Sequence, residues 1–134
     1  MPISKGVTVF AILFAVDRFT KIAALYFFTD SVTLNTKAFG VFDQAVIPLL
    51  FFGALVILIA LWFARERSFA SAIIFAGALG NAFDRLRYGA VIDWLTIPGL
   101  TVLNVADIYI VIGCALVILK GYAVKSMFRK RCRP

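Results

Sequence analysis

Length, composition and charge place this chain among membrane proteins. Its 134 residues are 63% hydrophobic, with a mean hydropathy of +0.98, whereas soluble domains are about 45–50% apolar. We therefore expect a single transmembrane domain, residues 1–134. The formal net charge is +7 and there is no histidine, which excludes histidine triads, histidine metal sites and imidazole proton relays. The two cysteines, Cys114 and Cys132, predict no disulfide framework.

Four apolar stretches predict four transmembrane helices, because each has roughly the 20 residues that a bilayer core requires. The second stretch carries no charge, whereas the other three carry polar residues inside apolar sequence. Charges at positions 17 to 21 interrupt the first stretch, so we expect no cleavable signal peptide. The predicted helices cover residues about 7–28, 46–64, 69–86 and 103–122.

Lysine and arginine predict the orientation of these helices. Basic residues crowd one set of helix ends, whereas the opposite connections hold Lys37, with Arg85 and Arg87 at a helix edge. The positive-inside rule places both termini in the cytoplasm and the connections at about 29–45 and 87–102 outside. We interpret the basic C-terminal tail as a topology anchor rather than a nucleic-acid-binding segment. The crowded ends carry Lys5, Arg65, Arg67, Lys120, Lys125, Arg129, Lys130, Arg131 and Arg133.

With this orientation, the polar residues of three helices gather in the outer part of the membrane. At about 1.5 Å per residue, Asp17 lies about 15 Å from the cytoplasmic side and Asp84 about 22 Å, while Asn104 and Asp107 begin the fourth helix from outside. A charge in a bilayer costs at least about 2.5–3.5 kcal/mol, so it is rarely idle. Scattered polar residues would not share one depth, and we expect a functional site there.

Two charge pairs are predicted among these residues. Asp84 is adjacent to Arg85, and a carboxylate beside a cation stays ionised, so we interpret Asp84 as architectural. Asp17 and Lys21 are four residues apart with the acid first, the favourable order for a helical ion pair. That pair either neutralises itself or contacts polar groups of the third and fourth helices.

A face of small residues runs along the third helix toward these charges. Every fourth residue from Ser68 to Gly80 is small, and Asp84 ends the series. Small residues let helices approach closely in lipid. The face is either ordinary helix packing or a scaffold that presents Asn81, Asp84 and Arg85.

Asp93 and Asp107 have no cation within four positions and lie between apolar residues. Apolar surroundings raise the pKa of a carboxyl group, and two neighbouring carboxyl groups drive their pKa values apart. A pair that shares one proton supplies an acid and a base together, as in aspartic proteases. Asn104, one turn before Asp107, is placed to bind substrate or carboxylate. The alternative is that both acids are structural, with Asp107 satisfying amides at a helix end.

Four motifs in chain order resemble one family. They are Asp17-Arg18-Phe19-Thr20-Lys21, Asn81-x-x-Asp84-Arg85, Gly89-x-Val91-x-Asp93-Trp94 and Asn104-Val105-Ala106-Asp107. Together they look like the bacterial lipoprotein signal peptidase family, signal peptidase II, over most of the chain and with the same topology.

The resemblance implies a multi-pass aspartyl endopeptidase of the bacterial cytoplasmic (inner) membrane, with its active site near the extracytoplasmic face. It implies removal of the signal peptide from a prolipoprotein, just before the diacylglyceryl-modified cysteine. Membrane lipid surrounds such an enzyme, and we expect no cofactor, no metal and no nucleic-acid partner. Asp93 and Asp107 would be the catalytic dyad. The residues that would line or support it are Asp17, Lys21, Asn35, Asn81, Asp84, Arg85 and Asn104.

The outer segments depart from the family pattern. The family has Asn-x-Gly-Ala-Ala-Phe before the second helix, whereas this chain has the shorter Asn35-Thr36-Lys37-Ala38-Phe39-Gly40. The segments from Lys21 to Asn35 and from Asp93 to Asp107 are also shorter than usual. In the family they build a β-cradle and an amphipathic helix that hold substrate, so we expect an all-α membrane protein with a reduced extracytoplasmic β-cradle. Two alternatives stay open: a small proton-coupled membrane transporter, and an inactive homologue that acts as an assembly partner.

Overall fold

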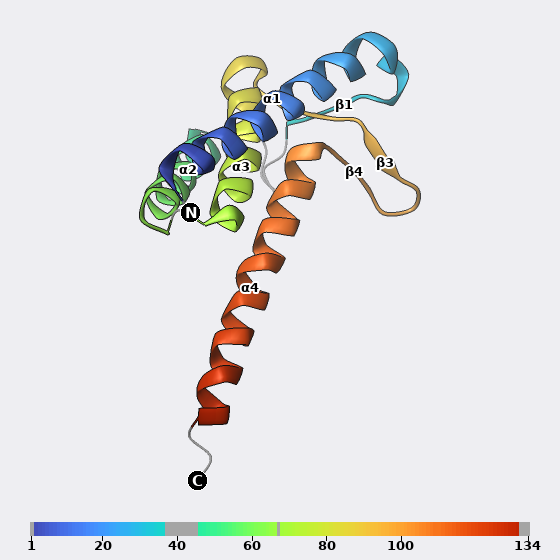
Figure 1. Ribbon diagram of the computed structural model, residues 1–134. Helices are drawn as coiled ribbons and strands as arrows, with labels where there is room; N and C mark the ends of the chain where they lie inside the picture. Colours follow the sequence, from blue (N-terminus) through green and yellow to red (C-terminus); the bar gives the residue numbers. More distant parts are fainter. Residues whose placement is uncertain (1, 37–45, 67, 132–134) are drawn as a thin grey trace.

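Four helices and four short strands make up the part of the chain that the computed structural model describes, residues 2–36, 46–66 and 68–131. Figure 1 shows α1 running across the upper part of the molecule in front of α3, with α2 at the left and α4 extending away from the other helices. In chain order the elements are α1 (Ile3–Phe27), the 3-10 turn η1 (Thr29–Ser31), β1 (Thr33–Asn35), α2 (Val46–Glu66), α3 (Phe69–Tyr88), β2 (Val91–Asp93), β3 (Leu95–Ile97), β4 (Thr101–Leu103) and α4 (Val105–Arg131).

The four predicted helices are present, but their bounds differ from the expected ones. α1 begins at Ile3 and ends at Phe27, and α3 continues to Tyr88. α4 begins at Val105 rather than at Leu103, because Leu103 belongs to β4, and it continues to Arg131 through the basic tail. Cations near a helix C-terminus interact favourably with its dipole, which is consistent with this extension.

α3 contacts the other three helices, and its ends are set by local signals. Ser68 and Ser71 form a reciprocal N-terminal cap, in which each side chain accepts a hydrogen bond from the other's backbone N–H. At the other end Gly89 adopts a left-handed conformation with φ 70°, a geometry that glycine takes without steric cost. These two end signals fix the residues at which α3 begins and ends, and so fix which of its residues face the neighbouring helices.

The small face of α3 is a packing surface. Ala72 and Ala76 are fully buried. A Cβ on Gly77 would lie 2.4 Å from the Ala106 carbonyl oxygen, and one on Gly80 would lie 2.6 Å from Asp17 Oδ2. The absence of side chains therefore lets α4 and α1 approach α3, and the packing interpretation is confirmed. At Gly80 the same feature also makes room for a carboxylate.

The strands form two antiparallel pairs that bring distant segments together. β1 pairs with β2, placing Thr33 opposite Asp93. β3 and β4 form a hairpin that places Leu95 opposite Leu103, and Trp94 N–H donates to the Leu103 carbonyl at 3.0 Å. The hairpin returns the chain from the end of β2 to the start of α4. The expected small β structure is thus present, although Lys37–Gly40 of the departing motif lies outside the described residues.

One described helical stretch, Val105–Tyr122, is long and apolar enough to cross a membrane when judged by length and composition. A shorter apolar stretch covers Leu55–Arg65. Side chains from Cys114 to Tyr122 on α4 are exposed, and in Figure 1 this part of the helix projects beyond the others. Four membrane crossings with both termini in the cytoplasm stay a prediction.

Candidate active site

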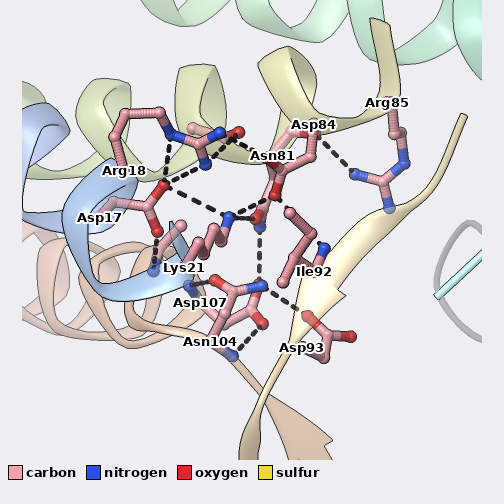
Figure 2. A network of polar contacts seen from close by, with 12 residues as sticks. Asp17, Arg18, Lys21, Asn81, Asp84, Arg85, Ile92, Asp93, Asn104 and Asp107 are labelled. Carbon is pink, nitrogen blue, oxygen red and sulfur yellow. Dashed lines mark hydrogen bonds and ion pairs between the residues drawn. The ribbon is translucent and has the colours of Figure 1, made fainter. Parts of the chain in front are cut away.

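A connected network of polar side chains lies where α3 ends, α4 begins and β2 passes between them (Figure 2). It gathers every site residue that the sequence predicted. Asp17 and Lys21 come from α1, Asn35 from β1 and Asp93 from β2. α3 contributes Asn81, Asp84 and Arg85, and Asn104 and Asp107 lie at the start of α4.

Four of the charged groups form a buried cluster, here called the charge quartet: Asp17, Arg18, Lys21 and Asp84. Lys21 Nζ lies 2.7 Å from Asp84 Oδ2 and 3.3 Å from Asp17 Oδ2. Arg18 forms ion pairs with the same two aspartates. Both carboxylates are fully buried and the Lys21 side chain is 1% exposed. Two cations balance two anions, so the attraction between opposite charges offsets part of the free-energy cost of burying each of them.

The quartet also binds the backbone of neighbouring elements. Asp84 Oδ2 accepts a hydrogen bond from the Ile92 N–H of β2 at 3.3 Å. Asp17 Oδ1 accepts one from the Ala106 N–H of α4 at 3.1 Å. Asp17 and Lys21 thus contact α3 and α4 groups rather than only each other. The ion pairs therefore fix β2 and the first turn of α4 relative to α1 and α3.

The predicted pairing of Asp84 with Arg85 was wrong. Asp84 is paired with Arg18 and Lys21 of α1, because Gly80 allows α1 to come close on that face of α3. Arg85 Nη1 lies 3.5 Å from the Asn81 carbonyl oxygen. Among carboxylates, Asp107 attracts the Arg85 guanidinium most strongly, followed by Asp93 and then Asp84. Arg85 therefore acts electrostatically on the predicted dyad.

Arg18 is the site residue that sequence reasoning missed. Besides its two ion pairs, it donates to the Gly80 carbonyl at 3.1 Å and lies over the rings of Phe14 and Phe83, at 5.7 and 5.1 Å from their centroids. Charge balance was the available signal, since two acids deep in apolar sequence, Asp17 and Asp84, require more cations than Lys21 alone.

Asp93 and Asp107 are each held by N–H donors on both carboxylate oxygens. Asp93 accepts from Asn104 Nδ2 at 2.6 Å and from Asn35 Nδ2 at 3.0 Å. Asp107 accepts from Asn81 Nδ2 at 2.7 Å and from the Asn104 backbone N–H at 3.1 Å. Both side chains are consequently fixed in position by groups from different elements.

Asn104 connects the two aspartates. Its Oδ1 accepts the Asp107 backbone N–H at 3.1 Å, so its Nδ2 must face Asp93. Asp107 also accepts the Asn104 backbone N–H, which makes the two residues a reciprocal cap of α4. The structural alternative for Asp107, satisfying amides at a helix end, is therefore confirmed, whereas its catalytic role stays a prediction. The cap and the contact to Asp93 use different atoms.

The two carboxyl groups differ in burial. Asp93 is 3% exposed, whereas Asp107 is half-buried. Burial raises the pKa of Asp93 above the ordinary value, and hydrogen bonds from Asn35 and Asn104 partly oppose this effect. The neighbouring Asp107 charge raises the pKa of Asp93 further, whereas Lys21 lowers it.

Within the described residues, no cluster of three or more His, Cys, Asp or Glu side chains could hold a metal ion.

Residues 9–123 match the family described as signal peptidase (SPase) II. The chain belongs to the signal peptidase II family. It is 32% identical over 144 residues to the lipoprotein signal peptidase of Rhodopseudomonas palustris strain TIE-1, a match that covers 84% of this chain and 88% of that protein. It is 41% identical over 101 residues to the lipoprotein signal peptidase of Chlamydia trachomatis serovar D, covering 66% of this chain and 60% of the relative.

The chain also resembles solved structures at the level of the fold. A bacterial membrane enzyme determined by the in meso method at 2.3 Å resolution matches with a TM-score of 0.75 at 21% identity. The match covers 98% of this chain and 94% of that one. Membership of the signal peptidase II family implies that this chain is a protease.

Proposed function

We propose that this chain is an intramembrane aspartyl endopeptidase that removes the signal peptide from diacylglyceryl-modified prolipoproteins, cleaving before the lipidated cysteine. Its relatives are lipoprotein signal peptidases. The observation that carries the proposal is the pair Asp93 and Asp107, connected by Asn104 and held on every carboxylate oxygen by an N–H donor. Such fixed carboxyl groups in unlike surroundings suit acid–base chemistry on a peptide bond.

The surroundings divide the roles. We assign Asp93, whose pKa is raised by burial, as the acid that donates a hydrogen bond to the scissile carbonyl oxygen. Asp107 is then the base that removes a proton from the attacking water. The tetrahedral intermediate breaks as a proton passes to the leaving amine.

Replacement of each carboxyl group tests this mechanism. We expect Asp93→Asn and Asp107→Asn each to abolish cleavage of a lipid-modified prolipoprotein by purified protein in detergent, while the protein stays folded. Asp30→Asn is the matched control, because Asp30 is an exposed carboxylate in η1 outside the network, and it should cleave at the wild-type rate. Substantial turnover by either dyad variant would contradict the two-aspartate mechanism.

The same assay separates the two alternatives. A transporter would not cleave, and proteoliposomes would show a proton flux that Asp107→Asn abolishes. An inactive homologue would show neither activity. A prolipoprotein that lacks the diacylglyceryl group provides the substrate control, since the proposed enzyme should cleave it much more slowly.

We also propose four crossings of the bacterial cytoplasmic membrane, with both termini inside and the site near the outer face. The bias of basic residues supports this orientation. In a variant with both native cysteines replaced by serine, an impermeant thiol reagent should label a cysteine at position 37 in intact cells and miss one at position 125. The opposite labelling would overturn the orientation.

A further inference from the structure

We propose that Lys21 is a positioning residue for the catalytic dyad, which it serves by fixing the orientation of the Asn81 side-chain amide. The inference rests on the proposed peptidase function, which it extends to a residue that does not touch Asp93 or Asp107. The contacts that carry it run from α1 through α3 to α4: Lys21 Nζ donates to Asn81 Oδ1 at 2.9 Å, and Asn81 Nδ2 donates to Asp107 Oδ1 at 2.7 Å.

The chemistry of an ammonium group gives this chain of contacts a single direction. A lysine has three N–H donors and no acceptor. Only the oxygen of the Asn81 amide can face Lys21, so the nitrogen must face Asp107. If the amide turned over, its oxygen would face the Asp107 carboxylate and its N–H groups would face a cation. Both contacts would then be repulsive.

The ammonium group of Lys21 is itself fixed in position by its polar partners. Its Nζ has three partners, Asp84 at 2.7 Å, Asn81 at 2.9 Å and Asp17 at 3.3 Å, which match its three donors. The side chain is 1% exposed, so water does not compete for these contacts. The buried charge quartet therefore sets the position of an N–H group that Asp107 accepts.

A comparison with Arg18 distinguishes the positioning role of Lys21 from a role in charge balance alone. Arg18 pairs with Asp17 and Asp84, as Lys21 does, and its further hydrogen bond goes to the Gly80 carbonyl. Removing either cation has the same effect on the net charge of the quartet. Only the removal of Lys21 releases the Asn81 amide.

The electrostatic surroundings of the dyad predict the sign of the effect on pH dependence. Among the described residues, Arg85 of α3 acts electrostatically on both aspartates and Lys21 of α1 acts on Asp93, while β1 adds the neutral Asn35. Lys21 lowers the pKa of Asp93. Loss of Lys21 should therefore raise the pKa of Asp93 and move the alkaline limb of the pH–rate profile to higher pH.

Two charge-balanced double variants provide the test. Lys21→Met with Asp84→Asn, and Arg18→Met with Asp84→Asn, each remove one cation and the same anion from the quartet. We expect the Lys21 double variant to show a kcat at least tenfold below that of the Arg18 double variant, because a small misplacement of a reacting group costs up to about 10²-fold. The alkaline limb of its pH–rate profile should lie at higher pH than that of the Arg18 double variant, because Lys21 lowers the pKa of Asp93. Equal kcat values and coincident profiles would overturn the proposal.

A second readout needs no catalysis, so failure of the inference is distinguishable from failure of the proposed function. The chain has three asparagines and each double variant has four, so Asn81→Ser made in each background assigns the Asn81 side-chain signal in ¹⁵N-asparagine-labelled protein in detergent. The Asn81 amide protons should exchange slowly with water in the wild type and in the Arg18 double variant, and rapidly in the Lys21 double variant. Slow exchange in all three proteins would overturn the role of Lys21, whether or not the protein cleaves.

Discussion

Replacing Arg18 by methionine should destabilise the protein in a way that a second, charge-removing substitution repairs. Arg18→Met leaves two fully buried carboxylates, Asp17 and Asp84, with Lys21 as the remaining cation of the quartet. Removing one partner of a buried ion pair costs about 3–5 kcal/mol. Because Lys21 contacts both acids, we expect the lower end of that range. The lost contacts with Phe14 and Phe83 add about 0.5–1 kcal/mol.

The repair follows from the charge count. In Arg18→Met with Asp84→Asn, Lys21 and Asp17 remain at 3.3 Å as one balanced pair. An asparagine at position 84 can still accept the Ile92 N–H through its side-chain oxygen. The remaining loss should be about 1–2 kcal/mol, from hydrogen bonds that are no longer made. The double variant should therefore be more stable than the single variant.

Reversible SDS unfolding in mixed micelles measures both differences. Arg85→Met is the matched control, because it removes an arginine from α3 while Asp84 keeps both of its α1 partners. It should lower the free energy of unfolding by less than Arg18→Met does. A double variant less stable than Arg18→Met alone, or an Arg85→Met protein as unstable as Arg18→Met, would refute the assignment of Arg18 as the partner of Asp84.

Gly77→Val should lower the free energy of unfolding by about 1–3 kcal/mol, because overpacking forces α3 and α4 apart. Gly53→Ala, where nothing lies within 4 Å, should leave it equal or raise it by up to about 1 kcal/mol in the same unfolding assay. Equal effects of the two substitutions on the free energy of unfolding would contradict the close packing of α3 against α4 at Gly77. Asn35→Ala removes an N–H donor that lowers the pKa of Asp93, so the alkaline limb of kcat/KM should move to higher pH. A limb that moves to lower pH would remove Asp93 from the role of acid.

Single-residue and short-range patterns predicted much of the site. Apolar stretches of about 20 residues marked the helices, because a bilayer sets their length. The lack of nearby cations singled out Asp93 and Asp107, and the structure joins them through Asn104. Spacing of i, i+4 predicted the contact of Asp17 with Lys21, and the structure places the two charged groups 3.3 Å apart. The catalytic roles of these residues stay a prediction.

Contacts between helices could not be predicted in the same way. Sequence adjacency suggested Arg85 as the partner of Asp84, but the partner depends on which helix lies over that face of α3. Gly80 allows α1 to lie there, so Arg18 reaches Asp84. The pairing of β1 with β2, which brings Asn35 to Asp93, involves strands of three residues. Such strands are too short for an alternation pattern to show.

The reciprocal cap of α4 has a consequence for how the length of such a chain can vary. Asn104 and Asp107 define the first turn of the helix and also contact Asp93 and Asn81. An insertion between positions 104 and 107 would therefore disrupt the helix start and the dyad together. The β3–β4 hairpin can change at its exposed tip, near Gly99, without altering either contact. Insertion of an epitope or a fluorophore at that turn should leave the helix start and the contacts of the dyad intact, which makes the tip a practical place to attach a reporter of folding.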